Sequence, residues 1–255
     1  MQLISLLLSV IFLGMQFIPG PPKAGTVSGR VEIRTPAPQQ MVSRYPSPGG
    51  QVQMDINPIP TLVFIDGPVA GAVAWPKLSR LAIVQKNLQF SPPLLVVPKD
   101  TSISFPNEDD EYHNVFSYSK SKRFDLGRYP HGESKSVVFD RPGIVKIYCE
   151  IHPWMRAAVL VLENPYYGIV ASDGTFSITG IPAGHYELVV WNIDTGSKKV
   201  DVDVPAGVAP EVLVRLSGRF APQVPERALR LDALAATRAN SASPLPKGAC
   251  CAGKR

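Results

Sequence analysis

The sequence predicts an all-β protein with one or two packed domains. Its 255 residues are 45% hydrophobic, which is enough apolar material for one or two hydrophobic cores. The 26 prolines and 20 glycines interrupt many short runs rich in Val, Ile, Phe and Tyr, a pattern typical of short strands joined by frequent turns. Long amphipathic helices are scarce. GxGxxG, P-loop, HExxH and GxSxG patterns do not occur, so the usual enzyme fingerprints are absent.

Residues 1–23 predict an export signal. The stretch from Gln2 to Ile18 is apolar and uncharged, although it lacks the usual basic residue before it and an A-x-A cleavage site. Cleavage is expected between Gly20 and Ala24. An uncleaved membrane anchor is the alternative, because about eighteen apolar residues just span a bilayer. Either outcome places the folded part in the periplasm or outside the cell. No cysteine follows the apolar run, which argues against a lipoprotein.

Residues 24–80 predict a β segment with a long loop. Apolar runs at residues 27–33, 61–65 and 70–75 indicate three strands. Pro, Gln, Ser and Gly dominate residues 36–60, which predicts a surface loop between the first strand and the second.

Metal-binding residue types gather in the middle of the chain. Cys149-x-x-His152-x-x-Met155 follows the strand-like run of residues 143–148. A thiol, an imidazole and a thioether suit copper, and one further imidazole would complete a trigonal His₂Cys site with a long axial Met. Residues on one straight strand point alternately to opposite faces, so a loop at the strand end lets these side chains converge on one ion.

The second imidazole has to come from the remaining histidines. His113 ends a polar loop after the alternating run 101–105 and opens the apolar stretch 114–116, a common position for a ligand at a strand end. His131 and His185 lie in turn sequences, where polar side chains usually face solvent. The predicted metal ligands are therefore His113, Cys149, His152 and Met155.

The predicted export gives the thiol of Cys149 a further meaning. Exported proteins tend to pair their cysteines, so a lone thiol there needs an explanation, and metal ligation is one. A disulfide from Cys149 to Cys250 or Cys251 is the alternative, although those two lie in a polar, low-complexity tail.

Residues 81–163 resemble a cupredoxin of the plastocyanin type. The matching motifs are Val97-Pro-x-x-Thr-x-Ile-x-Phe-x-Asn107, His113-Asn-Val, and Pro142-Gly-x-Val-x-x-Tyr-Cys-x-x-His-Pro-x-Met155. The loop from Cys149 to Met155 is most similar to the copper-ligand loop of amicyanin, and the surrounding sequence is similar to methylamine utilisation proteins. The resemblance implies a Greek-key β-sandwich with one type I copper ion. It also implies that Asn114 ties the His113 segment to the Cys149 loop and so helps to orient the copper ligands without binding the ion itself.

The resemblance implies one-electron transfer as the function, and two alternatives stay open. A copper carrier or store would use the same four ligands without rapid redox cycling. A non-metal binding or structural module would carry a vestigial ligand set. We expect no enzyme activity, because copper oxidases and nitrite reductases need further copper sites, and His131 and His185 are too isolated to build one.

Residues 164–217 resemble the carboxypeptidase regulatory-like β-sandwich. They reproduce its Asp173-Gly-x-Phe-x-Ile178 and Pro182-x-Gly-x-Tyr186 turns, a motif that says little about activity. The sequence Gly67-Pro-Val-Ala-Gly-Ala-Val73 resembles the early part of the same sandwich. The copper domain is therefore expected either to be inserted into this second sandwich or to share strands with it.

The charges restrict the classes of partner. Residues 218–255 form a low-complexity tail, expected to be disordered, with seven basic and two acidic residues, which equals the whole chain's net charge of +5 and leaves a neutral body. No nucleic-acid partner is expected. Residues 225–238 could form a short amphipathic helix that touches a membrane or a redox partner, although a solvated tail is the simpler interpretation. The acidic run 108–111 could guide a basic redox partner protein. Apart from that helix, only an uncleaved N-terminus would contact a membrane.

Overall fold

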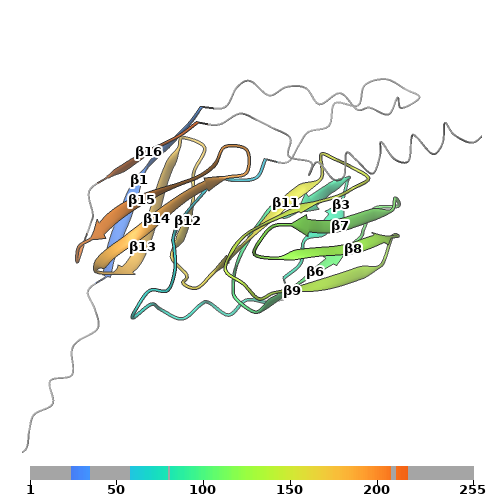
Figure 1. Ribbon diagram of the computed structural model, residues 1–255, viewed down its shortest axis with the longest axis horizontal. Helices are drawn as coiled ribbons and strands as arrows, with labels where there is room; N and C mark the ends of the chain where they lie inside the picture. The colour runs from blue at the N-terminus through green and yellow to red at the C-terminus, as the bar shows by residue number, and fades with distance from the viewer. Residues whose placement is uncertain (1–23, 35–57, 80, 208–210, 218–255) are drawn as a thin grey trace, which may run out of the picture.

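The computed structural model describes residues 24–34, 58–79, 81–207 and 211–217 (Figure 1), and these residues form sixteen strands with connecting turns. The predicted export signal, most of the Pro-rich loop, and the tail with Cys250 and Cys251 lie outside this part of the chain. In the described ranges, no helix has the length and apolar character needed to cross a bilayer.

The two ends of the described chain form one β-sandwich. One sheet has the strand order β13-β1-β16 and the other has the order β12-β2-β14-β15. The first strand pairs antiparallel with β13 and parallel with β16, while β2 pairs with β14. Its strands are β1 (Ala24–Arg34), β2 (Leu62–Ile65), β12 (Tyr167–Ile169), β13 (Thr175–Pro182), β14 (Gly184–Asn192), β15 (Gly196–Val204) and β16 (Val212–Ser217). We call this unit the flanking sandwich.

A second β-sandwich is inserted between β2 and β12. Its larger sheet has the order β5-β11-β10-β7-β8, and the paired strands β6-β9 and β3-β4 lie opposite. Its strands are β3 (Val84–Lys86), β4 (Gln89–Ser91), β5 (Leu94–Pro98), β6 (Thr101–Pro106), β7 (His113–Tyr118), β8 (Arg123–Tyr129), β9 (Ser134–Phe139), β10 (Gly143–Tyr148) and β11 (Arg156–Leu162). We call this unit the inserted sandwich. The all-β prediction is confirmed, and of the two arrangements expected for the middle domain the structure shows insertion.

The strand predicted at residues 70–75 is wrong. Residues 66–79 form turns and irregular backbone. Gly67 and Gly71 adopt positive φ angles of 76° and 71°, which a strand does not contain. The N–H of Ala72 is bonded to the carbonyl of Val69 at 3.2 Å, and the N–H of Val73 is bonded to the hydroxyl of Tyr166 at 3.2 Å. These turn contacts use donors that a strand would give to its ladder.

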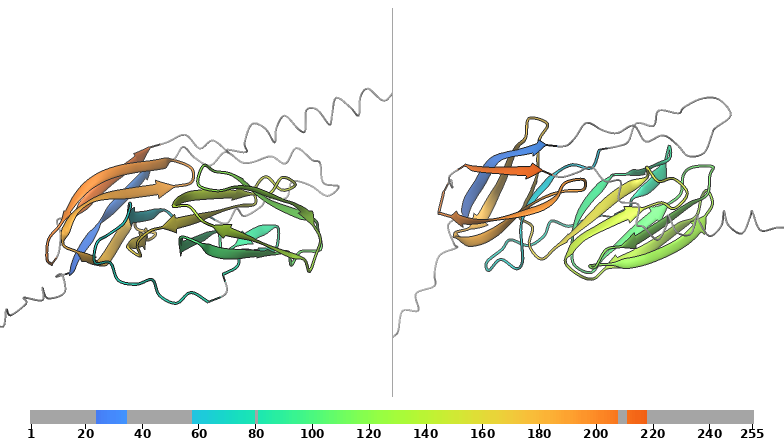
Figure 2. Two further views of the ribbon diagram at one scale, coloured as in Figure 1. Left: turned by 60° about the horizontal axis from the view of Figure 1, so that its bottom comes forward. Right: turned by 45° about the horizontal axis from the view of Figure 1, so that its top comes forward.

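The two sandwiches lie side by side (Figures 1 and 2) and share an apolar interface. Alternate residues of β11 face different cores. Ala157, Val159 and Val161 pack inside the inserted sandwich. Ala158, Leu160 and Leu162 pack against side chains of β2 and β14, such as Phe64 and Trp191. Because strand side chains alternate between faces, the uninterrupted apolar sequence of β11 follows from its burial on both sides.

An ion pair also joins the two sandwiches. Arg156, the first residue of β11, donates from Nη1 and Nη2 to the two carboxylate oxygens of Asp194 at 2.6 and 3.4 Å. Asp194 lies in the β14–β15 turn, where its N–H is bonded to Asn192. Both partners are mostly shielded from solvent. The start of β11 is therefore tied to the flanking sandwich.

Leu160→Ala tests the interface. Leu160 is 1% exposed between the sandwiches, so its truncation leaves a cavity and should lower the free energy of unfolding by about 2–5 kcal/mol. Chemical denaturation measures the change. The control is Leu213→Ala, the same substitution at a side chain that is 50% exposed, which should cost at most about 0.5 kcal/mol. Equal effects of the two variants would contradict a packed interface.

Candidate metal centre

The loop from Cys149 to Met155 is closed at its base by the β10–β11 ladder. Tyr148, the last residue of β10, pairs with Arg156, the first of β11. One residue further on, the N–H of Cys149 donates to the carbonyl of Met155 at 3.3 Å. Inside the loop, the N–H of Met155 donates to the carbonyl of His152 at 2.9 Å, which folds the chain back on itself. The loop ends are thus fixed by regular sheet geometry.

His113 reaches the same place from a neighbouring strand. It is the first residue of β7, which runs antiparallel to β10 with Phe116 opposite Tyr148. The start of β7 therefore lies beside the end of β10, where Cys149 follows. Two residues that are 36 positions apart in sequence meet because, in an adjacent antiparallel pair, one strand begins at the end of the sheet where the other strand stops.

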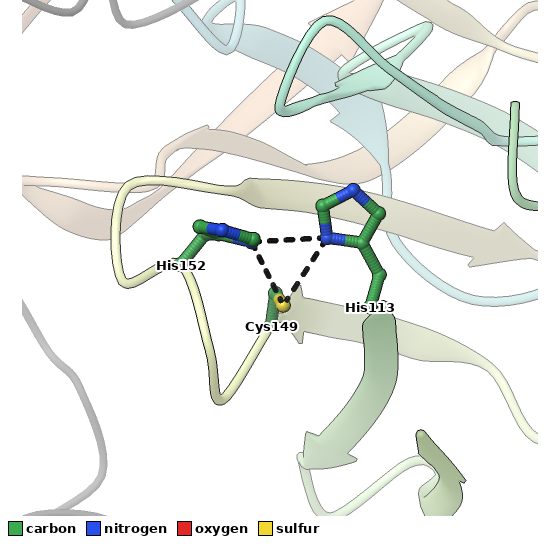
Figure 3. Close-up of side chains that lie close together, drawn as sticks. All are labelled: His113, Cys149 and His152. Atoms are coloured by element: carbon green, nitrogen blue, oxygen red, sulfur yellow. Dashed lines mark hydrogen bonds between the residues drawn. The ribbon is translucent and has the colours of Figure 1, made fainter. Parts of the chain in front are cut away.

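Three of the predicted ligands converge (Figure 3). The Sγ atom of Cys149 is 4.0 Å from Nδ1 of His113 and 4.0 Å from Nδ1 of His152, and the two nitrogens are 3.0 Å apart. A point in the plane of these atoms that is about 2.1 Å from each nitrogen is about 2.2 Å from the sulfur, close to the bond lengths of a bound metal ion with such donors. The three donor atoms could therefore bind one metal ion in a trigonal arrangement.

The fourth predicted ligand, Met155, is 1% exposed and belongs to the same core cluster as Cys149. Its neighbours are apolar side chains of the inserted sandwich, including Ala157 at the start of β11. A thioether is a soft donor that suits copper.

Asn114 connects the two segments that carry the donors. Its Oδ1 accepts from the N–H of Glu150 at 2.7 Å, and its Nδ2 donates to the carboxylate of Asp125 on β8 at 3.0 Å. The side chain is 2% exposed. Asn114 directly follows His113, and Glu150 directly follows Cys149. The hydrogen bond between them therefore fixes the spacing between the imidazole and the sulfur.

A carboxylate that the sequence analysis did not single out touches His113. Oδ2 of Asp109 is 2.8 Å from Nε2 of His113. Burial alone raises the pKa of Asp109, but hydrogen bonds from the N–H groups of Leu88 and Asn87 and from His113 outweigh it and lower the pKa. The ionised carboxylate places a proton on Nε2 and leaves the lone pair of Nδ1 facing the sulfur. In the sequence, Asp109 was one member of the acidic run 108–111, with nothing to mark it from its neighbours.

His152 occupies a more open position. Its ring packs against Trp154, with centroids 5.2 Å apart, and Nε1 of Trp154 donates to the carbonyl of Leu88 at 3.2 Å. His152 is partly exposed, and Pro153 is exposed beside it. Burial and then the neighbouring His113 lower the pKa of His152, which favours the neutral imidazole that binds a metal.

The thiol of Cys149 is buried among donors. The pKa of the thiol is raised, because burial outweighs the backbone N–H groups of Asn114, His152 and Ile151, which hydrogen bond to the sulfur and act in the opposite direction. Such donors stabilise a thiolate, the form that binds a metal. Cys149 is the one cysteine of the described residues and is not in a disulfide there.

The other two histidines lie apart from the cluster. His131 is exposed in the β8–β9 turn, with Nδ1 3.2 Å from the backbone oxygen of Asp109. His185 lies on β14 in the flanking sandwich, with Nδ1 2.8 Å from Asp203. Neither belongs to the His-Cys-His cluster, the one group of three or more such side chains found in the described ranges.

Comparison with known proteins finds partial structural similarity. No family model and no curated protein matches the chain. A purple cupredoxin from Nitrosopumilus maritimus is 27% identical over 32% of this chain and 98% of its own, with a TM-score of 0.29. A copper(I) amicyanin variant is 19% identical over 32% of this chain and 81% of its own, with a TM-score of 0.31.

A copper-containing nitrite reductase from Thermus scotoductus SA-01 is 26% identical over 38% of this chain, with a TM-score of 0.32. The matched part spans 25% of that enzyme's chain. Each of these three alignments covers less than two fifths of this chain. The resemblance of residues 164–217 to a carboxypeptidase regulatory-like sandwich stays a prediction.

Asn114→Ala tests the link between the ligand segments. The N–H of Glu150 loses its acceptor at a partly buried position, so the free energy of unfolding of the metal-free protein should fall by about 1–3 kcal/mol. Denaturant titration measures it. Asp125→Ala removes the other partner of the same amide, an exposed carboxylate, and should cost less. An Asn114→Ala variant as stable as the unaltered chain would show that the contact is not important.

His185 should titrate above its ordinary pKa of 6.5, because the hydrogen bond to Asp203 and the charges of Asp203 and Asp201 favour the imidazolium. The stabilisation is then complete below pH 6.5 and is lost as the pH rises through the folded-state pKa. An NMR titration of the ring measures this. Asp203→Asn should lower the pKa, and Asp201→Asn, whose carboxylate is 3.9 Å away, should lower it less. A pKa at or below 6.5 would refute the expectation.

Proposed function

We propose that the chain is an exported copper protein that carries single electrons, with His113, Cys149, His152 and Met155 as the ligands of one type I copper ion. The observation that supports this most directly is the triangle of two Nδ1 atoms and one Sγ atom, which surrounds a point at metal-bonding distance from all three.

The donor types favour copper over other metals. A thiolate, two neutral imidazoles and a thioether are soft and borderline donors, and their trigonal arrangement with a weak axial ligand suits both Cu(I) and Cu(II). A bound copper ion would supply the exchange of one electron. The task of the protein is to keep the donors in place during that exchange, so that little rearrangement is needed.

The contacts that hold the donor side chains in place favour electron transfer over copper delivery. His113 is fully buried and is held by Asp109, and Cys149 is 4% exposed. The base of the ligand loop is closed by the sheet, and Asn114 braces it. Ligands held from several directions resist the opening that release of copper to an acceptor requires.

The same arrangement suggests how a partner would approach. His152 is the partly exposed ligand, with Pro153 exposed next to it. We propose that an unidentified redox protein docks over this imidazole edge and exchanges electrons there, without catalysis by the copper site itself. If the chain is exported through the N-terminal apolar stretch, copper ligation would explain why Cys149 is not paired in a disulfide.

Copper loading of the full chain tests the proposal. The unaltered protein should bind one copper ion and, as Cu(II), show the intense visible thiolate-to-copper band and the narrow hyperfine EPR splitting of a type I site. Cys149→Ser should abolish the band, because the thiolate donates the charge-transfer electron. Optical and EPR spectra are the measurements.

His152→Ala and His185→Ala provide a matched pair of histidine variants. The first removes a proposed ligand and should change the spectra. The second removes an exposed histidine of the flanking sandwich and should leave them unaltered. A protein that stays copper-free at stoichiometric supply would instead support a non-metal module. A copper form that exchanges electrons slowly and readily gives its copper to an apo acceptor would support a carrier.

A further inference from the structure

The carboxylate of Asp109 is held in place from two sides. Oδ2 contacts Nε2 of His113 at 2.8 Å, and the N–H groups of Asn87 and Leu88 donate to Oδ1 and Oδ2 at 2.6 and 2.9 Å. The side chain of Asp109 is 10% exposed and that of His113 is fully buried. In addition, the N–H of Asp109 donates to Oδ1 of Asn107 at 3.0 Å. Both oxygens therefore have fixed donors.

The turn that supplies two of these donors has an uncommon backbone. Asn87 and Leu88 join β3 to β4 and have positive φ angles of 54° and 56°. Two successive residues in this region form the tight hairpin turn whose twist suits antiparallel strands. Leucine is seldom found in this conformation, because its Cβ crowds the backbone. The contacts to Asp109 help to offset the cost of that turn.

The same turn reaches the second imidazole. The carbonyl of Leu88 accepts from Nε1 of Trp154 at 3.2 Å, and the ring of Trp154 packs against that of His152. One carboxylate thus contacts His113 directly and is connected to His152 through Leu88 and Trp154. The exposed acids of the same loop have different positions: Glu108 pairs with Lys86 at the surface, and Asp110 is exposed.

We infer that Asp109 is a positioning residue that lowers the reduction potential of the site by stabilising its Cu(II) form, an inference that rests on the proposed copper function. A carboxylate bonded to the far nitrogen of a ligating imidazole fixes the ring and increases the basicity of the nitrogen that faces the metal. Stronger donation and nearby negative charge both stabilise the more highly charged ion, so Cu(II) gains more than Cu(I).

The test compares Asp109→Asn with Asp110→Asn in the copper-loaded full chain. Both remove one negative charge, one residue apart, but Asp109 is the one bonded to His113. Removal of an outer-shell partner commonly changes metal affinity by 10–100-fold. We expect Asp109→Asn to weaken Cu(II) relative to Cu(I) about tenfold, which raises the potential by about 59 mV. Asp110→Asn should cause less than a third of that shift, and Asp109→Glu should stay nearer the unaltered value than Asp109→Asn.

Redox titration of the visible band gives the potential, and separate Cu(I) and Cu(II) affinities show which form is affected. Equal shifts in the two Asn variants, with copper bound in both, would overturn the role of Asp109 and leave the copper function intact. If the unaltered chain binds no copper, the proposed function fails instead.

The unaltered protein offers a second measurement in case Asp109→Asn does not fold. In the diamagnetic Cu(I) form, the Nε2 proton of His113 should resonate downfield of the corresponding proton of His152, because a carboxylate acceptor makes a short, charge-assisted hydrogen bond. Similar proton shifts for the two rings would overturn the inference. The bond would then be absent when copper is present.

Discussion

The antiparallel pairing of β10 with β11 is the constraint on which the rest of the site depends. It ends at Tyr148 and Arg156, so the seven residues between them form a closed loop that carries the sulfur, one imidazole and the thioether. Because β10 also pairs with β7, His113 lies at the same end of the sheet. Asn114 and Asp109 then act on positions that the ladder has already brought within a few ångströms.

The ladder is itself supported from outside the inserted sandwich. One face of β11 packs in the core of the inserted sandwich and the other against β2 and β14. Arg156 directly follows Met155 and is paired with Asp194 of the flanking sandwich. Removal of one partner from a shielded ion pair leaves an uncompensated charge, so this contact resists separation of the two units. The flanking sandwich thereby stabilises the base of the ligand loop.

Features carried by short sequence spacing were predictable, and distant ones were predictable only where a ligand set or a family resemblance called for them, as with His113 and the split sandwich. Cys149-x-x-His152-x-x-Met155 lies within one short loop, and short apolar runs between turn residues predicted most strands. Asp109 was missed because one carboxylate in an acidic run looks like its neighbours, and its role depends on a hairpin turn 21 residues away. The prediction of a strand at residues 70–75 was wrong because Gly67 and Gly71 adopt positive φ angles, so this apolar stretch forms turns.

The two imidazoles of the site have unequal surroundings, and the difference matches two separate requirements of the proposed electron-transfer function. His113 is sealed from water and bonded to an anion, where electrostatic interactions are weakly screened and the donor strength can be adjusted. His152 is partly exposed and packs on an indole ring, where a partner can approach but a fixed charge would be screened. Under the proposed function, a charge that adjusts the donor strength is most effective on the buried imidazole, and electron exchange with a partner would use the exposed one. The placement of Asp109 beside His113 and of Trp154 beside His152 therefore separates control of the donor strength from access to the surface.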